Sequence, residues 1–183
     1  MLEINLHGPH ALLPNSDDIS YLLAEPQAWT SGIFLWTFLY NQAYRVNYIG
    51  VSNDNIAKQH NTLIAEFLAG KRNVLRASPL AEGRVEPAFG PQDDRGVFVA
   101  AFPDLMEHVA ALRVFFAPVD GPDSLRERIA SALIARYHEL GGKAAEWLDN
   151  EVCEYSADGY NESITLRFGR PAFIASLPDE MHI

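Results

Sequence analysis

Histidine and cysteine are the side chains best suited to proton transfer or metal binding, and their spacing here narrows what they can do. His7 and His10 lie close enough in sequence to reach one metal ion, but no carboxylate or cysteine pattern completes a ligand set. His108 and His138 stand singly. Cys153 is the only cysteine, so the chain can form neither an intramolecular disulfide nor a cysteine-based zinc site, and a reducing compartment is favoured. Walker-type and dinucleotide phosphate loops, a His-Glu-x-x-His helix and a nucleophile elbow are all absent from the sequence.

His60 has two open roles. It could act as a general base or bind a phosphate group. It also falls in the apolar stripe of a predicted helix, where a buried, hydrogen-bonded core histidine is the alternative. Asp54 or Asn55 is expected to cap this helix, and Gly70 to end it. The other stripe positions recur at helical spacing: Ile56, Leu63 and Phe67.

Three strands are expected to form the sheet that positions these side chains. Residues 32–40 are apolar on both faces, which predicts a strand in the middle of a sheet. Residues 44–51 can pair with it through a short turn at 41–43. Residues 113–117 predict a third core strand, which Pro118 ends.

The remaining elements surround that sheet. Ser124 and Glu127 have capping-box spacing at the start of a helix that Gly141 ends, and residues 105–112 predict another helix. Residues 2–6 and 163–168 alternate like strands, and residues 18–25 fit one or two helical turns closed by Pro26. Residues 78–103 predict a long irregular excursion with one edge strand.

Composition and charge set the broad class. The 183 residues, 48% of them apolar, suit one domain spanning 1–183. With no apolar run near the roughly 20 residues that span a bilayer and no signal pattern at the N-terminus, we expect a soluble, cytoplasmic protein without membrane contact.

The charge balance opposes strong non-specific DNA binding, because 24 acidic against 14 basic side chains give a net charge of -10. Two basic clusters stand out against it and are interpreted as ordinary solvated faces. They comprise Lys71, Arg72, Arg76 and Arg84, and Arg126, Arg128 and Arg136.

Two triplets, 32–34 (Gly-Ile-Phe) and 48–50 (Tyr-Ile-Gly), lie on the two arms of the predicted hairpin, and a capped helix follows. With the later RVFFAP strand leading into an RERIASALI helix, this arrangement resembles the GIY-YIG nuclease family. The resemblance covers roughly 31–140, with 1–30 as an accessory N-terminal layer and 141–183 as a C-terminal extension. It implies an α/β (α+β) fold: a small central, mostly antiparallel three-stranded sheet flanked by helices.

The resemblance implies metal-dependent phosphodiester hydrolysis with Mg²⁺ or Mn²⁺. The family places tyrosines in both triplets, an arginine on the first helix and a metal-binding glutamate on a later helix. Carried over residue by residue, the second tyrosine is retained as Tyr48. The other three positions fall on Phe34, Gln59 and Ala130, which lack the hydroxyl, the positive charge and the carboxylate.

Two functional hypotheses follow. In the first, the chain is a degenerate, non-catalytic GIY-YIG-like domain that binds a protein or a nucleic-acid element. In the second, it is a divergent metal-dependent DNA endonuclease whose lost groups are supplied by Lys58, His60 and Glu127 beside Tyr48. Glu127 also has the capping role given above, so a metal-binding role for it is one of two alternatives. Neither hypothesis yields a confident cofactor or metal site.

Overall fold

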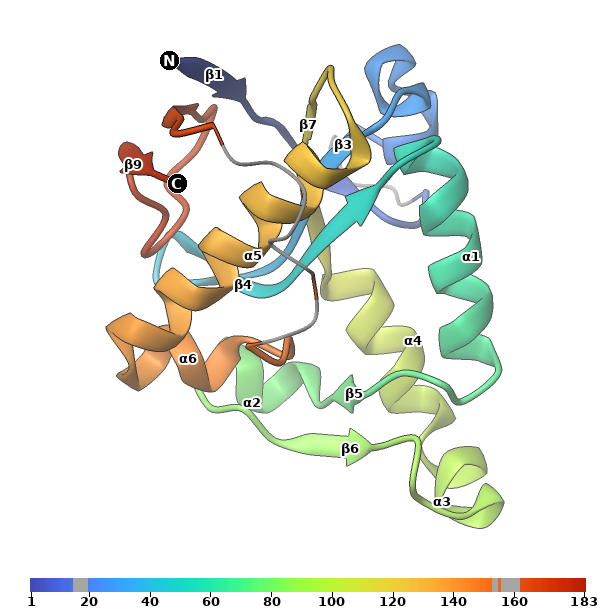
Figure 1. Ribbon diagram of the computed structural model, residues 1–183. Helices are drawn as coiled ribbons and strands as arrows, with labels where there is room; N and C mark the ends of the chain where they lie inside the picture. The colour runs from blue at the N-terminus through green and yellow to red at the C-terminus, as the bar shows by residue number, and fades with distance from the viewer. Residues whose placement is uncertain (15–19, 153–154, 156–161) are drawn as a thin grey trace.

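The computed structural model describes residues 1–14, 20–152, 155 and 162–183 (Figure 1). Its central feature is the hairpin of strands β3 (Gly32–Tyr40) and β4 (Ala43–Ser52). Asn41 and Gln42 form the tight turn, with positive φ angles of 49° and 60°. Two successive left-handed residues are the geometry of a two-residue hairpin turn that matches the twist of the strands. The predicted hairpin is thus confirmed.

The sheet has four strands where three were expected. Its order is β2-β7-β3-β4, and every neighbouring pair is antiparallel. Strand β7 (Arg113–Pro118) is the predicted third core strand, and β3 lies between it and β4. The additional strand is β2 (His7–Ala11), which pairs along the free edge of β7. The three-strand prediction missed it because a His-Gly-Pro-His run has little strand propensity, and pairing with β7 overrides that propensity.

Two separate hydrophobic cores cover the two faces of this sheet, because successive side chains of a strand point to opposite faces. Helices α1 (Ile56–Leu68) and α4 (Phe102–Ala111) pack on the face that carries Phe34, Trp36 and Tyr48. Helix α5 (Asp123–Leu140) packs on the other face, over Ile33 and Ile49. Figure 1 shows the sheet between α1 and α5.

The N-termini of α1 and α5 can be compared with the caps predicted for them. Asn55 caps α1, and its side-chain oxygen accepts a hydrogen bond from the Lys58 backbone N–H at 2.9 Å, as expected. The prediction of a capping box at Ser124 is wrong. Helix α5 begins at Asp123 with Pro122 as its N-cap, and no side-chain cap bond forms. The helix starts earlier than the pattern indicated, which places Ser124 inside the first turn and leaves Glu127 free to bond elsewhere.

The stretch predicted as irregular, 78–103, contains more regular structure than expected. A two-stranded ladder, β5 (Val74–Leu75) with β6 (Pro87–Phe89), encloses the short helix α2 (Ala77–Ala81). Helix α3 (Arg95–Ala100) then leads into α4. Helix α3 carries its own cap, because the Asp94 side chain accepts from the backbone N–H groups of Gly96 and Val97.

The terminal segments form a second, three-stranded sheet. Its order is β1 (Leu2–Asn5), β8 (Thr165–Gly169) and β9 (Glu180–His182), so the predicted first and last strands exist but lie outside the central sheet. Helix α6 (Gly142–Trp147) follows α5.

The predicted helix at 18–25 lies partly outside the described residues. Its described part forms a 3₁₀ turn at Leu22–Ala24, and Pro26 starts a second turn, Pro26–Trp29, instead of closing the first.

Within the described part of the chain, no helix is both long enough and apolar enough to cross a membrane.

Candidate functional site

The two triplets that carry the resemblance, 32–34 and 48–50, meet through Phe34 and Gly50. These residues face each other in the β3–β4 register, and the ring of Phe34 lies over the glycine. A Cβ atom on Gly50 would come within 2.0 Å of the ring carbon Cζ. The glycine of the second triplet is therefore needed to seat the aromatic ring of the first. The same ring makes an edge contact with His60, with ring centroids 4.5 Å apart.

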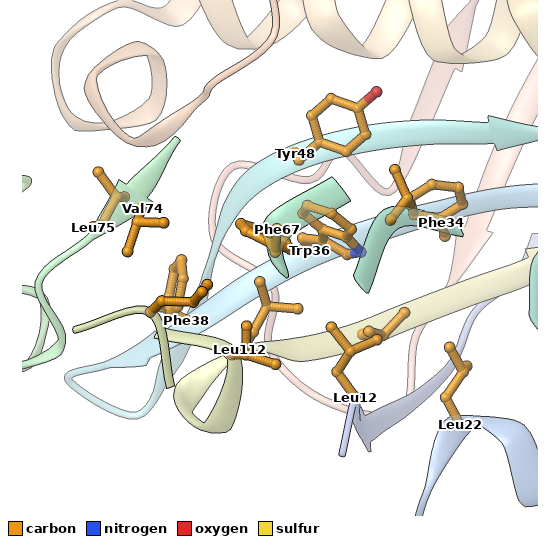
Figure 2. Packing of buried hydrophobic residues seen from close by; sticks show 14 of the residues in the cluster. Leu12, Leu22, Phe34, Trp36, Phe38, Tyr48, Phe67, Val74, Leu75 and Leu112 are labelled. Carbon is orange, nitrogen blue, oxygen red and sulfur yellow. The ribbon is translucent and has the colours of Figure 1, made fainter. Parts of the chain in front are cut away.

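Tyr48 lies in an aromatic cluster on the α1 face of the sheet. Its ring is 5.1 Å from that of its cross-strand partner Trp36, and only 7% of the residue is exposed. Figure 2 shows Phe34 and Trp36 projecting from one strand and Tyr48 from the next. The Tyr48 hydroxyl lies 3.3 Å from that of Tyr155. The phenol is thus packed by its ring and engaged through its oxygen.

His60 is held in one neutral form. Its Nε2 accepts a hydrogen bond from Trp36 Nε1–H at 3.0 Å, so its Nδ1 carries the proton and donates to the Ile56 carbonyl at 2.7 Å. The residue is fully buried, and this burial lowers its pKa to about 4. Both ring nitrogens are therefore hydrogen-bonded within the protein. His60 is the buried core histidine of the second alternative, and it has no free nitrogen for a substrate.

Arg72 is the charged residue that the structure places beside Tyr48, and sequence reasoning missed it. Its guanidinium carbon lies 5.1 Å from the Tyr48 ring centroid and 5.7 Å from that of Trp36. Its Nε donates to the Glu66 carboxylate at 2.8 Å. Periodicity could not reveal the contact, because Arg72 follows the turn at Gly70, whose φ of 69° reverses the chain after α1. The only available signal was a carboxylate near the end of a helix and an arginine just beyond it.

Lys58 and Gln59 lie apart from this cluster, at the start of α1. Both line an open hollow together with Asn53 and Thr62. Lys58 is exposed and pairs with Asp54 at 2.7 Å, one helical turn away, and this hydrogen bond raises the pKa of the lysine. Exposed pairs of this kind contribute little to stability. Lys58 is therefore the accessible cation at this hollow, whereas Gln59, on which the arginine of the resemblance falls, is half-buried and neutral.

Ala130 and Glu127 lie on α5, across the sheet from Tyr48. Ala130 is completely buried in the core that contains Ile33 and Ile49, whereas Tyr48 belongs to the opposite core. The Glu127 carboxylate, half-buried, accepts from the Asn53 side chain at 3.3 Å, at the end of β4. The structure thus brings Phe34, Tyr48 and His60 together and places Ala130 in the opposite core. It puts Glu127 against Asn53, which lines the hollow beside Lys58 and Gln59.

The buried Arg126 corrects the solvated reading of the second basic cluster. Only 3% of this residue is exposed, and its guanidinium donates to Asn53 Oδ1 and to the carbonyls of Val119 and Gly121. It also pairs with Asp123. Arg126 therefore fastens the start of α5 to the β4–α1 turn.

No family model, curated protein or solved structure matches this chain.

Proposed function

We propose that this chain is a non-catalytic domain of the GIY-YIG nuclease type that binds a partner protein. The observation that carries the proposal is the distribution of the family positions over two faces of one sheet. Phe34 and Tyr48 belong to the core beneath α1, and Ala130 belongs to the core beneath α5. A nuclease site needs its phenol, cation and metal ligand within a few ångströms of one phosphate, and this arrangement separates them.

The residues present do not fit a catalytic metal ion. Hard cations such as Mg²⁺ take carboxylate oxygens, and the position implied for the metal-binding glutamate is a buried alanine. Among the residues that the structure describes, no three His, Cys, Asp or Glu side chains gather in a way that could hold a metal.

A protein is a better partner than a nucleic acid because two arginines of the first basic cluster are already paired with carboxylates. Arg72 pairs with Glu66, and Arg84 pairs with both Glu82 and Glu86. A surface that binds phosphate backbones needs several free cations in a row, and the net charge of -10 adds long-range repulsion.

The surface best suited to a protein partner is an apolar patch on α3 and α4. We define it by four residues that are 42% to 64% exposed: Val97, Val99, Phe102 and Met106. Four acidic residues lie in the same segment against Arg95 alone: Asp93, Asp94, Asp104 and Glu107. Exposed apolar groups flanked by one sign of charge favour an amphipathic segment of the opposite sign. We therefore propose that this patch binds a basic amphipathic helix of a partner protein.

A titration with a designed Leu/Lys amphipathic helical peptide tests the binding part of the proposal. Fluorescence anisotropy should show saturable binding at fixed ionic strength. The double variant Phe102→Ser/Met106→Ser should weaken it roughly tenfold, since two apolar anchors are lost. Leu39→Ser and Phe173→Ser are matched controls, because these residues are 56% and 62% exposed outside the patch. Equal weakening by the controls would contradict the patch, and tighter binding of branched DNA than of the peptide would favour a nucleic-acid partner.

The rival candidate is a divergent metal-dependent endonuclease, and one observation favours it. Arg72 over the Tyr48 ring, with Glu66 beside it, supplies a phenol, a cation and a carboxylate on one face of the sheet. Incubation with supercoiled plasmid and branched DNA in Mg²⁺ or Mn²⁺ separates the two candidates. The non-catalytic proposal expects intact DNA. Cleavage that EDTA, Tyr48→Phe and Arg72→Met each abolish would overturn it.

A further inference from the structure

A small hollow lies between strand β4, helices α5 and α6 and the segment after β8. Five of its lining residues carry polar or aromatic side chains: Arg45, Tyr137, Lys143, Trp147 and Ser176. Of these, Lys143 and Ser176 are exposed, so the hollow reaches the surface. Neither the proposed function nor the family resemblance uses any of them.

Two cations share one aromatic ring at this hollow. The Arg45 guanidinium carbon lies 6.0 Å from the Tyr40 ring centroid, and Lys143 Nζ lies 4.9 Å from it. In the described part of the chain, no salt bridge to a carboxylate is formed by either residue, although Lys58, Arg72 and Arg170 all have one. In an acidic protein, two neighbouring cations without a carboxylate form a local positive potential.

Trp147 adds a donor without an acceptor. The residue is 1% exposed, and its Nε1–H has no hydrogen-bond partner within the described structure. Arg45 Nε, also buried, has none either. The other two indoles differ, because Trp29 donates to the Leu23 carbonyl and Trp36 donates to His60. Buried donors are nearly always paired, so two unpaired N–H groups on residues that line one hollow indicate that an acceptor belongs there.

We propose that this hollow binds a compact oxyanion, a carboxylate or phosphate group. Arg45 and Lys143 would neutralise its charge, and Trp147 Nε1–H would donate to one of its oxygens. In the conformation described, the space between the lining side chains is narrower than a water molecule. The anion therefore enters by displacing the end of Lys143, an exposed and flexible side chain whose movement costs little. The proposal stands independently of the proposed function.

The three indole N–H signals of the ¹⁵N-labelled protein provide the test, once Trp→Phe variants have assigned them. Inorganic phosphate and sodium acetate are titrated separately at constant ionic strength, with chloride as the balancing anion. We expect a saturable shift of the Trp147 signal by at least one of the two anions, while the Trp29 and Trp36 signals stay in place. The anion with the lower dissociation constant is the oxyanion that the hollow prefers.

Arg45→Met and Lys143→Met should each raise the dissociation constant roughly tenfold, the loss expected for one charge-assisted hydrogen bond. Arg136→Met is the matched control on α5, because Arg136 is exposed and does not line the hollow. It should leave the constant unchanged. An unchanged Trp36 signal in each variant shows that the fold is intact. A Trp147 signal that does not saturate, or that saturates equally in wild type and both hollow variants, would overturn the proposal.

Discussion

Trp36 donates its indole N–H to Nε2 of His60 over 3.0 Å in the buried layer between the sheet and helix α1. The second ring nitrogen of His60 donates to the Ile56 carbonyl one helical turn earlier. The histidine is thus a polar link between β3 and the first turn of α1. The same bonds that make it a good structural link occupy every position from which it could act on a ligand.

Unfolding free energy should fall as the pH drops from about 6.5 towards 4. The folded pKa of His60 is about 4, below its ordinary value of 6.5, because burial disfavours the charged ring. A depressed histidine pKa means that its contribution is complete above the unfolded pKa and is lost as the pH falls towards the folded one. One such group gives a slope of at most ~1.4 kcal/mol per pH unit. Urea unfolding between pH 7.5 and 4 measures it.

His108 provides the comparison for that experiment. It is also buried, its pKa is likewise lowered to about 4 by burial, and its Nδ1 accepts from the Leu75 backbone N–H. His60→Gln should therefore remove the part of the slope that comes from one proton. It should leave the parts due to His108 and to His10, whose pKa burial also lowers. A His60→Gln protein whose stability falls as steeply with pH as the wild type would contradict the assignment. Absolute stability does not decide the question, because the variant also disturbs Trp36.

Ala130→Glu should destabilise the protein by roughly 3–5 kcal/mol or prevent folding, the usual consequence of burying an unpaired charge. Ala130 is fully buried against the sheet, and the buried cation one helical turn before it, Arg126, already donates to Asn53 and to the carbonyls of Val119 and Gly121. Ala132→Glu is the control, because Ala132 is a half-buried position on the same helix. Thermal unfolding followed by circular dichroism compares the two. An Ala130→Glu protein whose melting temperature stayed within a few degrees of the control would contradict this account.

Most of the central fold could be predicted because its signals are local. The all-apolar run of β3, the hairpin turn at Asn41–Gln42 and the Asn55 cap each follow from a few neighbouring residues. The elements that were missed depend on distant partners. Strand β2 forms because β7 offers an open edge, and α5 starts at Asp123 although Ser124 has the better capping pattern.

The candidate site was harder to predict because its geometry depends on which face of the sheet each residue occupies. Helical spacing correctly placed His60 in the buried stripe of α1. It could not show that α1 and α5 cover opposite faces, which separates Tyr48 from Ala130. Nor could spacing along the chain reveal Arg72, which reaches Tyr48 only because the chain reverses at Gly70.

Arg72→Met should destabilise the fold by roughly 1–2 kcal/mol. The change removes a cation from the faces of two aromatic rings and leaves the partly buried Glu66 without its partner. Arg72→Lys should recover only part of the loss, because an ammonium group lacks the planar shape that stacks on the rings. Arg84→Met is the control, since Arg84 pairs only with exposed carboxylates. Denaturant unfolding at pH 7 ranks the three variants, and equal losses for Arg72→Met and Arg84→Met would show that the ring contacts contribute nothing.

Gly50→Ala should cost roughly 1–3 kcal/mol, because the new methyl group would overlap the Phe34 ring. Phe34→Leu alone should also destabilise, because it leaves a gap against His60. In the double variant the smaller side chain makes room for the methyl group, so the combined loss should be at least ~1 kcal/mol less than the sum of the single losses. Urea unfolding of the four proteins completes the cycle. Strictly additive losses would mean that residues 32–34 and 48–50 do not depend on each other through this contact.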